Sequence, residues 1–394
     1  MQAHPQPRRV VVTGLGVIGP CGIGRDAFWK GLHGPAPEGD RLVHDFDPTV
    51  WLGPKEARRT DRFAQMAIGA AELALEQAGP VGADPDRSGV ILATGVGGLH
   101  TLEEQILVRA AKGEKRVSPF LVPMMMANAG AASLSMRFGW RGPCETVVTA
   151  CAASTHAIGY AARLVSIGVC DAVMTGGSEA SITLTALAGF GNMTALSPDK
   201  QSRPFDVDRN GFVIAEGAAV LVLEELEAAR ARGATILGEV MGSASTADAH
   251  HITAPSPDGS GAVRAMELAI QDAGLQPGGI AHINGHGTST PLNDAAEAEA
   301  INKVFGTPGP PVTSTKGVTG HALGAAGALE AAAVLLSMEH RQIPPTIGLV
   351  NQDPEITLDV VTGGPRAWEP GPSLSNSFGF GGHNGCLVIG PPPA

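Results

Sequence analysis

The chain has 394 residues, of which 43% are hydrophobic and only 16% are charged, so it can bury a large core. Its net charge of −11 argues against general binding to nucleic acid. The five cysteines are scattered, odd in number and without CxxC spacing, so they indicate neither a disulfide framework nor a zinc site.

The first predicted element is a strand at residues 10–12, which are three consecutive valines. No signal peptide is visible, and no uninterrupted apolar run is long enough to span a bilayer, so we expect a cytoplasmic protein without membrane contact. Residues 55–62 then form a local basic cluster in this acidic chain. Taken alone, such a cluster is most simply interpreted as a solvated helix start. Its cations are Lys55, Arg58, Arg59 and Arg62.

A cysteine between a predicted strand and a predicted helix is the most informative single residue. The β-branched run at residues 146–149 predicts the strand, and the apolar spacing after Cys151 predicts the helix. A thiol at such a turn faces unpaired helix N–H groups and the positive end of the helix dipole, which favours the nucleophilic thiolate. A buried, inert cysteine is the alternative, and position alone does not decide between the two.

The order of elements repeats along the chain. A helix that ends at residues 72–79 is followed by a strand at 89–93, and a helix that ends at 267–274 is followed by a strand at 280–283. Each half then offers another strand that runs into a helix of small residues. Short strands that alternate with helices predict an α/β fold built around mostly parallel sheets.

We place the boundary between the two halves near Gly233, after a charged helix predicted at residues 224–229. This division gives an N-terminal half of residues 1–233, which contains the cysteine turn and the basic cluster. The C-terminal half, residues 234–394, contains the partners that a cysteine nucleophile needs.

Two histidines framed by glycines lie in the C-terminal half. His286 stands in the motif NGHGTST at the end of a predicted strand, and His321 stands in TGHALGAAG before a helix start. A helix N-terminus disfavours imidazolium, so a neutral His321 can donate a hydrogen bond to a carbonyl. Lys316 lies just upstream and Glu330 further along the same helix, which makes a buried ion pair conceivable.

A glycine-rich segment, NSFGFGG at residues 376–382, lies between two strand-like stretches near the C-terminus. Glycines there would let a backbone N–H group approach a ligand closely, as an oxyanion hole requires. An ordinary glycine-rich hairpin is the alternative.

Together these motifs resemble the β-ketoacyl-[acyl-carrier-protein] synthases, and most closely their type II, elongating kind. The matching signatures are TAC at 149–151, GHGTST at 285–290, TKGVTGH with GAAG at 315–327, and NSFGFGG at 376–382. The resemblance runs from the first strand to the last. It implies a thiolase fold, which is a five-layered α/β/α/β/α sandwich of two duplicated halves and is normally dimeric.

The resemblance also implies a reaction. Cys151 would take an acyl chain from acyl carrier protein (ACP) as a thioester, and the N–H groups of Cys151 and Phe380 would hold the oxyanion. His286 and His321 would donate to the thioester carbonyl of malonyl-ACP and stabilise the enolate left by decarboxylation. Attack of that carbanion on the acyl-cysteine would give 3-oxoacyl-ACP in fatty-acid elongation.

Other residues receive roles only through the resemblance. Lys316 would orient His321, with Glu330 as its charge partner. Phe380 would gate the site. The family's positions that contact the substrate's phosphopantetheine arm or belong to the gating loop correspond to Thr288, Thr290, Thr253, Gly379 and Gly381 in this sequence. The ligands of a structural monovalent cation found in some members match Asn284, Glu330, Ser375 and Asn376. No further cofactor is implied.

The basic cluster of residues 55–62 matches the family's docking helix for the acidic ACP, which such a patch would steer and orient. Thr194 departs from the pattern, because it replaces an arginine that helps docking in some bacterial members. Partner affinity or identity could therefore differ.

Several other functions fit the sequence less well. A thiolase would need a second catalytic cysteine near the C-terminus, and Cys386 lies in a strand-like run. An initiating type III synthase would have one histidine and an asparagine, and a non-catalytic chain-length factor would lack the nucleophile. The alternative that stays open is the ketosynthase subunit of a type II polyketide synthase, paired with a chain-length factor instead of forming a homodimer. A pure binding or scaffold role is excluded only by trapping an acyl group on Cys151.

Overall fold

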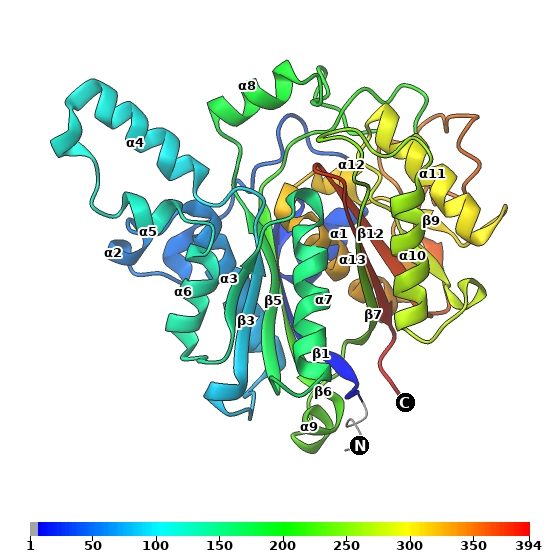
Figure 1. Ribbon diagram of the computed structural model, residues 1–394, viewed down its shortest axis with the longest axis horizontal. Helices are drawn as coiled ribbons and strands as arrows, with labels where there is room; N and C mark the ends of the chain where they lie inside the picture. The colour runs from blue at the N-terminus through cyan, green and yellow to red at the C-terminus, as the bar shows by residue number, and fades with distance from the viewer. Residues whose placement is uncertain (1–6) are drawn as a thin grey trace.

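The computed structural model describes residues 7–394 (Figure 1). Its main sheet has the strand order β4-β3-β5-β6-β1-β7-β13-β12-β8-β9, with β2 paired to β1. The strands of the first half are β1 (Val10–Gly19), β2 (Gly22–Ile23), β3 (Ser88–Ala93), β4 (Cys144–Val147), β5 (Ala172–Glu179) and β6 (Gly217–Glu225). Those of the second half are β7 (Gly238–Ala247), β8 (His282–Asn284), β9 (Val312–Thr313), β12 (Ser373–Gly379) and β13 (His383–Gly390), beside a small ribbon of β10 (Gln342–Ile343) and β11 (Arg366–Ala367).

The two halves of this sheet have the same topology. From the outer edge inward, β4-β3-β5-β6-β1 shows two parallel pairs and then two antiparallel pairs. The order β9-β8-β12-β13-β7 shows the same sequence of pairs. The two halves meet where β1 pairs with β7. The duplicated α/β organisation predicted from the order of elements is therefore confirmed.

Helices follow equivalent strands in the two halves. After its first strand each half has a long helix, α3 (Arg62–Ala78) or α10 (Ser260–Asp272), and after its edge strand another, α7 (Ala153–Ser166) or α13 (Ala326–His340). Both α7 and α13 contact strands of both halves, so they form the central layer, whereas α3 and α10 cover the two outer faces (Figure 1). The predicted five-layered sandwich is confirmed.

The remaining helices surround this framework. They are α1 (Arg25–Leu32), α2 (Pro54–Ala57), α4 (Leu99–Lys112), α5 (Leu121–Met125), α6 (Ala129–Phe138), α8 (Leu184–Asn192), α9 (Leu226–Ala231), α11 (Pro291–Phe305) and α12 (Lys316–Thr319). The segment with α4 and α5 extends away from the body in Figure 1. Within residues 7–394, no helix combines the length and apolarity needed to cross a membrane.

The central layer is built from small residues because its two helices touch closely. In α13 every residue from Ala326 to Met338 is buried. A Cβ added to Gly327 would lie 2.1 Å from Oγ1 of Thr155 on α7, so no side chain fits between the two helices at this point. The run of alanine and glycine in this part of the sequence is therefore a packing requirement.

Two boundaries differ from the sequence-based predictions. The strand before the cysteine ends at Val147, so residues 148 and 149 already belong to the turn. Glu224 and Glu225 end β6, and the predicted charged helix begins only at Leu226. Glu224 is buried there because Arg232 forms an ion pair with it, which allows a carboxylate at the end of a buried strand.

Candidate active site

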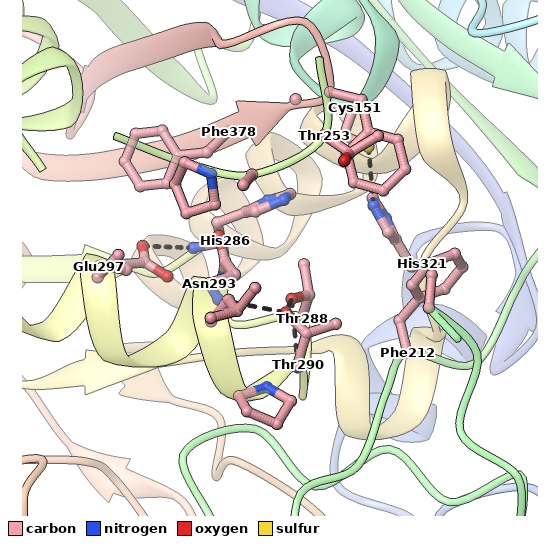
Figure 2. A pocket seen from close by; sticks show the side chains of 18 of the residues that line it. Cys151, Phe212, Thr253, His286, Thr288, Thr290, Asn293, Glu297, His321 and Phe378 are labelled. Carbon is pink, nitrogen blue, oxygen red and sulfur yellow. Dashed lines mark hydrogen bonds between the residues drawn. The ribbon is translucent and has the colours of Figure 1, made fainter. Parts of the chain in front are cut away.

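Cys151 occupies the turn between β4 and α7. The turn is the short 3-10 helix η4 (Ala150–Ala152), and Ala150 takes a φ of 49°, which a residue with a side chain rarely adopts. This backbone presents Cys151 to a cavity of about 390 Å³, which its side chain lines (Figure 2). The predicted strand-to-helix position of Cys151 is confirmed.

His321 is the nearest reactive neighbour of the thiol. Its Nε2 lies 3.0 Å from Sγ of Cys151. The backbone N–H of His321 donates to the carbonyl of Val213 at 2.8 Å, and the ring meets Phe212 edge to face with ring centroids 5.2 Å apart. These contacts on two sides hold the imidazole against the sulfur.

His286 approaches the same point from the end of β8. Its ring lies edge to face with that of His321, with centroids 5.3 Å apart. The backbone N–H groups of His286 and Gly287 each donate to the carboxylate of Glu297 on α11 at 2.7 Å (Figure 2). A buried carboxylate thus fixes the turn that carries His286.

Lys316 and Glu330 form a fully buried ion pair behind the two histidines. Nζ of Lys316 also donates to the backbone carbonyl of His286 at 2.6 Å and lies 3.3 Å from its Nδ1. An ammonium can only donate, so Nδ1 is the acceptor and Nε2 of His286 carries the hydrogen. Lys316 therefore orients His286 directly, whereas the resemblance assigns it to His321.

Burial determines the charge of the reacting groups. It raises the pKa of the Cys151 thiol to about 11, although Lys316 and the backbone N–H of Phe380 lower it. Burial also lowers the pKa of His286 and His321 well below the usual 6.5, and Lys316 lowers both further. The resting site holds a neutral thiol beside two neutral imidazoles. Desolvation therefore opposes the thiolate that the helix N-terminus by itself favours.

Two backbone N–H groups converge on the thiol. That of Phe380 hydrogen-bonds Cys151, and a Cβ on the adjoining Gly379 would lie only 3.0 Å from the backbone nitrogen of Cys151. Gly379 therefore permits the glycine-rich loop to approach the nucleophile turn. Two backbone donors that face the nucleophile can hold the oxyanion of a tetrahedral intermediate.

The cavity walls contain most of the other predicted substrate contacts. Thr288, Thr290, Thr253 and Gly379 line it, and the hydroxyls of Thr288 and Thr290 lie 2.9 Å apart (Figure 2). Gly381 does not line it. Its N–H donates to the carbonyl of Ile252 at 2.7 Å, so Gly381 joins the glycine-rich loop to the segment that carries Thr253 instead of contacting substrate.

The predicted cation ligands fit an ion only in part. Oδ1 of Asn284 is buried without a hydrogen-bond partner among residues 7–394, as a cation ligand would be. The carboxylate of Glu330 is engaged by Lys316, and Oδ1 of Asn376 accepts from Cys386. Ser375 contacts Nδ2 of Asn284 at 3.4 Å. We derive no catalytic step from an ion there.

The reacting trio itself has the composition of a metal site. Ligand atoms of Cys151, His286 and His321 all lie within 4.8 Å of one another. The ammonium of Lys316 touches the ring of His286, and a positive charge at that position opposes a bound cation. The arrangement instead suits proton transfer and hydrogen-bond donation to a carbonyl.

The basic cluster is exposed except at one position. Lys55, Arg58 and Arg59 lie at the surface of α2 and the following turn. Arg62 forms two hydrogen bonds with the buried carboxylate of Glu216, and its guanidinium lies over the ring of Phe46. Arg62 therefore has a structural role in addition to the docking role that the resemblance implies.

Sequence reasoning missed two acids that hold the His286 motif. Asp294 and Glu297 are both buried on α11, and Asp294 accepts from the N–H groups of Phe205 and Ser289. Their spacing of three residues puts them on one face of a helix. The sequence signal that could have identified them is a pair of acids three residues apart in the helix that follows the glycine-framed histidine.

Comparisons with known proteins agree with this site. The family descriptions "Beta-ketoacyl synthase, N-terminal domain" and "Beta-ketoacyl synthase, C-terminal domain" match residues 39–229 and 237–350. A protein of Synechocystis sp. named 3-oxoacyl-[acyl-carrier-protein] synthase 2 is 47% identical over 411 residues, which covers 98% of this chain and 99% of the relative.

Two solved structures are also similar over nearly the whole chain. One is described as the ishigamide ketosynthase/chain length factor, with 35% identity, a TM-score of 0.93 and coverage of 98% of this chain and 100% of that chain. The other is a type II polyketide acyl-carrier protein in complex with its ketosynthase, with 33% identity, a TM-score of 0.90 and the same coverage.

A cysteine nucleophile with two neutral histidines on a duplicated five-layered fold defines an acyltransferase. The matches extend over both halves of the fold. The chain belongs to the beta-ketoacyl synthase family.

The neutral thiol makes its reactivity depend on His321. Replacement of His321 by alanine should slow alkylation of Cys151 by iodoacetamide at pH 7 by about 10²-fold, because a general base contributes about that much. Peptide mass spectrometry measures the rate, and a small thiol added to the same sample provides the internal control because it should react equally with either protein present. Equal rates at Cys151 would show that another group accepts its proton.

Proposed function

We propose that the chain catalyses the decarboxylative condensation of malonyl-ACP with an acyl chain on Cys151, which gives 3-oxoacyl-ACP in fatty-acid elongation in the cytoplasm. The observation that carries this proposal is the 3.0 Å contact between Sγ of Cys151 and Nε2 of His321, with His286 facing the same point. The 47% identity to a 3-oxoacyl-[acyl-carrier-protein] synthase 2 supports the choice of substrate.

The first half-reaction moves the acyl chain onto the enzyme. Nε2 of His321 accepts the thiol proton while Sγ of Cys151 attacks the thioester carbonyl of acyl-ACP. The N–H groups of Cys151 and Phe380 stabilise the oxyanion, and the ACP thiol leaves with the proton held by His321. The phosphopantetheine arm that ACP brings would lie along Thr288, Thr290 and Thr253, which line the cavity.

The second half-reaction forms the carbon–carbon bond. His286 donates a hydrogen bond from Nε2 to the thioester carbonyl of malonyl-ACP. His321 donates to the same oxygen once its hydrogen has moved from Nδ1 to Nε2, so the electron pair of the breaking C–CO₂⁻ bond is held as an enolate. The enolate carbon attacks the acyl-cysteine carbonyl, and Cys151 leaves as thiolate and regains a proton from water. Carbon dioxide and 3-oxoacyl-ACP are released. The proposed steps need no cofactor apart from the arm carried by ACP.

The two half-reactions should respond differently to substitution. Cys151→Ala should abolish condensation and still release carbon dioxide from malonyl-ACP, because both histidines remain. His286→Ala should lower that decarboxylation by about 10²–10³-fold, the usual effect of losing one oxyanion donor, and affect acylation of Cys151 much less. Single-turnover assays with labelled malonyl-ACP and acyl-ACP separate the two. Condensation by the Cys151→Ala enzyme would refute the nucleophile.

ACP is proposed to dock on the exposed basic surface near α2. Arg59 lies over the ring of Phe120 at the start of α5, with its guanidinium carbon 4.5 Å from the ring centroid. This contact joins the turn after α2 to the start of α5. A second exposed basic cluster that sequence reasoning did not single out precedes α5 in the sequence, namely Arg109, Lys112, Lys115 and Arg116. An acidic carrier protein would meet both clusters as one basic surface.

Charge reversal at Lys55 and Arg58 should raise KM for acyl-ACP about ten-fold and flatten its salt dependence, because electrostatic steering acts on association. Thioesters of free pantetheine should react as with the unmodified enzyme. Lys30→Glu, which reverses one charge on the exposed face of α1, is the control matched to the Lys55→Glu single variant and should have no effect. Equal losses for ACP-bound and small substrates would contradict docking at α2.

A homodimer is the proposed assembly. Within residues 7–394, β4 pairs only with β3, so it leaves an open sheet edge. Apolar side chains are exposed on the segment with α4 and α5, among them Ile106, Leu107, Phe120, Val122 and Met126. An open edge beside exposed apolar residues is the kind of surface that a second copy covers.

The alternative is a ketosynthase subunit that works with a chain-length factor in polyketide synthesis. Similarity to the ishigamide ketosynthase/chain length factor structure favours it, but at 35% identity against 47% for the elongation enzyme. We expect the purified chain alone to be dimeric and to extend acyl-ACPs with malonyl-ACP. Sedimentation and product analysis test both points, and activity that appears only with an added chain-length factor would establish the alternative.

A further inference from the structure

The duplicated topology provides a second turn equivalent to the catalytic one. The short turn η6 (Leu323–Ala325) precedes α13 as η4 precedes α7. The first residue of η6, Leu323, has a φ of 43°, close to the 49° of Ala150 in η4. Gly324 therefore occupies in the second half the position that Cys151 occupies in the first.

No nucleophile fits at this second turn. A Cβ on Gly324 would lie 2.0 Å from the backbone nitrogen of Gly95. The N–H groups of Gly324 and Gly95 both donate to one carboxylate oxygen of Glu179, at 3.2 and 2.6 Å. Two backbone donors on one oxyanion form the arrangement that holds the reacting oxygen in acyl transfer. The pair of N–H donors at this second turn is thus occupied by the protein's own carboxylate, that of Glu179.

Both carboxylate oxygens of Glu179 accept hydrogen bonds. It ends β5 and is fully buried, and its second oxygen accepts from the hydroxyls of Ser181 at 2.5 Å and Thr94 at 3.4 Å. It does not line the active-site cavity. A buried carboxylate with this many donors fixes the groups around it, because leaving any of these donors unpaired is costly.

The turn that Glu179 holds continues directly from His321. Leu323 packs with Cys151 and Phe212 and lines the cavity. The backbone of His321 is fixed by its N–H bond to Val213 and by the bond that its carbonyl accepts from Ala215 at 3.0 Å. The next bond from this segment to another part of the fold is that from Gly324 to Glu179.

We propose that Glu179 is a positioning residue that fixes this second turn and thereby sets the 3.0 Å contact between His321 and Cys151. It touches neither substrate nor thiol. The inference rests on the proposed function only through the role of His321 as the acceptor of the thiol proton.

The test compares Glu179→Ala with Glu179→Gln, which have the same charge. Glutamine can place its carbonyl oxygen where Gly95 and Gly324 donate, whereas alanine leaves both N–H groups unpaired. We expect iodoacetamide to alkylate Cys151 about ten-fold more slowly in the alanine variant, since small misplacements of a reacting group can cost up to 10²-fold. The glutamine variant should react within about three-fold of the unmodified enzyme. Ser181→Ala, which keeps both backbone donors, is the matched control.

A His321→Ala background separates positioning from general destabilisation. Once His321 is removed, the alanine and glutamine variants at position 179 should be alkylated at equal rates, because no imidazole is left to misplace. Hydrogen exchange of residues 319–326 should be faster in Glu179→Ala than in Glu179→Gln. Where the alanine variant does not fold, Glu179→Asp replaces it, because the shorter side chain cannot reach both donors.

Three outcomes would overturn the proposal. The first is that the alanine and glutamine variants are alkylated at equal rates while His321 is present, and the second is that they still differ ten-fold when His321 is replaced by alanine. The third is that hydrogen exchange of residues 319–326 is the same in both variants. Iodoacetamide is independent of ACP. A chain that passes this test but does not condense acyl-ACP with malonyl-ACP would therefore refute the proposed function and leave the role of Glu179 standing.

Discussion

The close contact between α7 and α13 in the central layer is the constraint on which the site depends. The nucleophile turn leads into α7, and the turn that follows His321 leads into α13, so the two reacting groups meet only if the helices touch near their N-termini. Gly327 makes this possible, because a Cβ there would lie 2.1 Å from the hydroxyl of Thr155. A larger residue at this contact would separate thiol and imidazole before it affected the outer layers.

Burial then gives the site its chemistry. Desolvation keeps the thiol protonated and both imidazoles neutral, and the Lys316–Glu330 ion pair adds a fixed positive charge behind them. Neutral imidazoles can accept a proton from the thiol and can also donate to a carbonyl, which the two proposed half-reactions require in turn. An ion pair this deeply buried stabilises little by itself, but removing one partner would leave a charge unpaired.

Buried carboxylates have a shared structural task around this centre. Glu297 binds the backbone N–H groups at His286, Glu179 binds those at Gly324 and Gly95, and Asp294 binds those at Phe205 and Ser289. Burial raises the pKa of Glu179 and of Glu297 to about 7. Each acid anchors a loop that regular secondary structure leaves without backbone partners, so the loops at the ends of the strands hold fixed positions.

The sequence by itself determined the local features of this protein. The strand and helix on either side of Cys151, the glycine-framed histidines and the repeated order of elements follow from residue spacing, which needs no knowledge of distant contacts. Only the tertiary structure decided what depends on burial and on long-range partners. Arg62 has the sequence context of a surface cation, yet its guanidinium hydrogen-bonds the buried carboxylate of Glu216, more than 150 residues away. In the same way the helix N-terminus by itself favours a thiolate at Cys151, whereas burial, which only the folded chain provides, raises the pKa of the thiol.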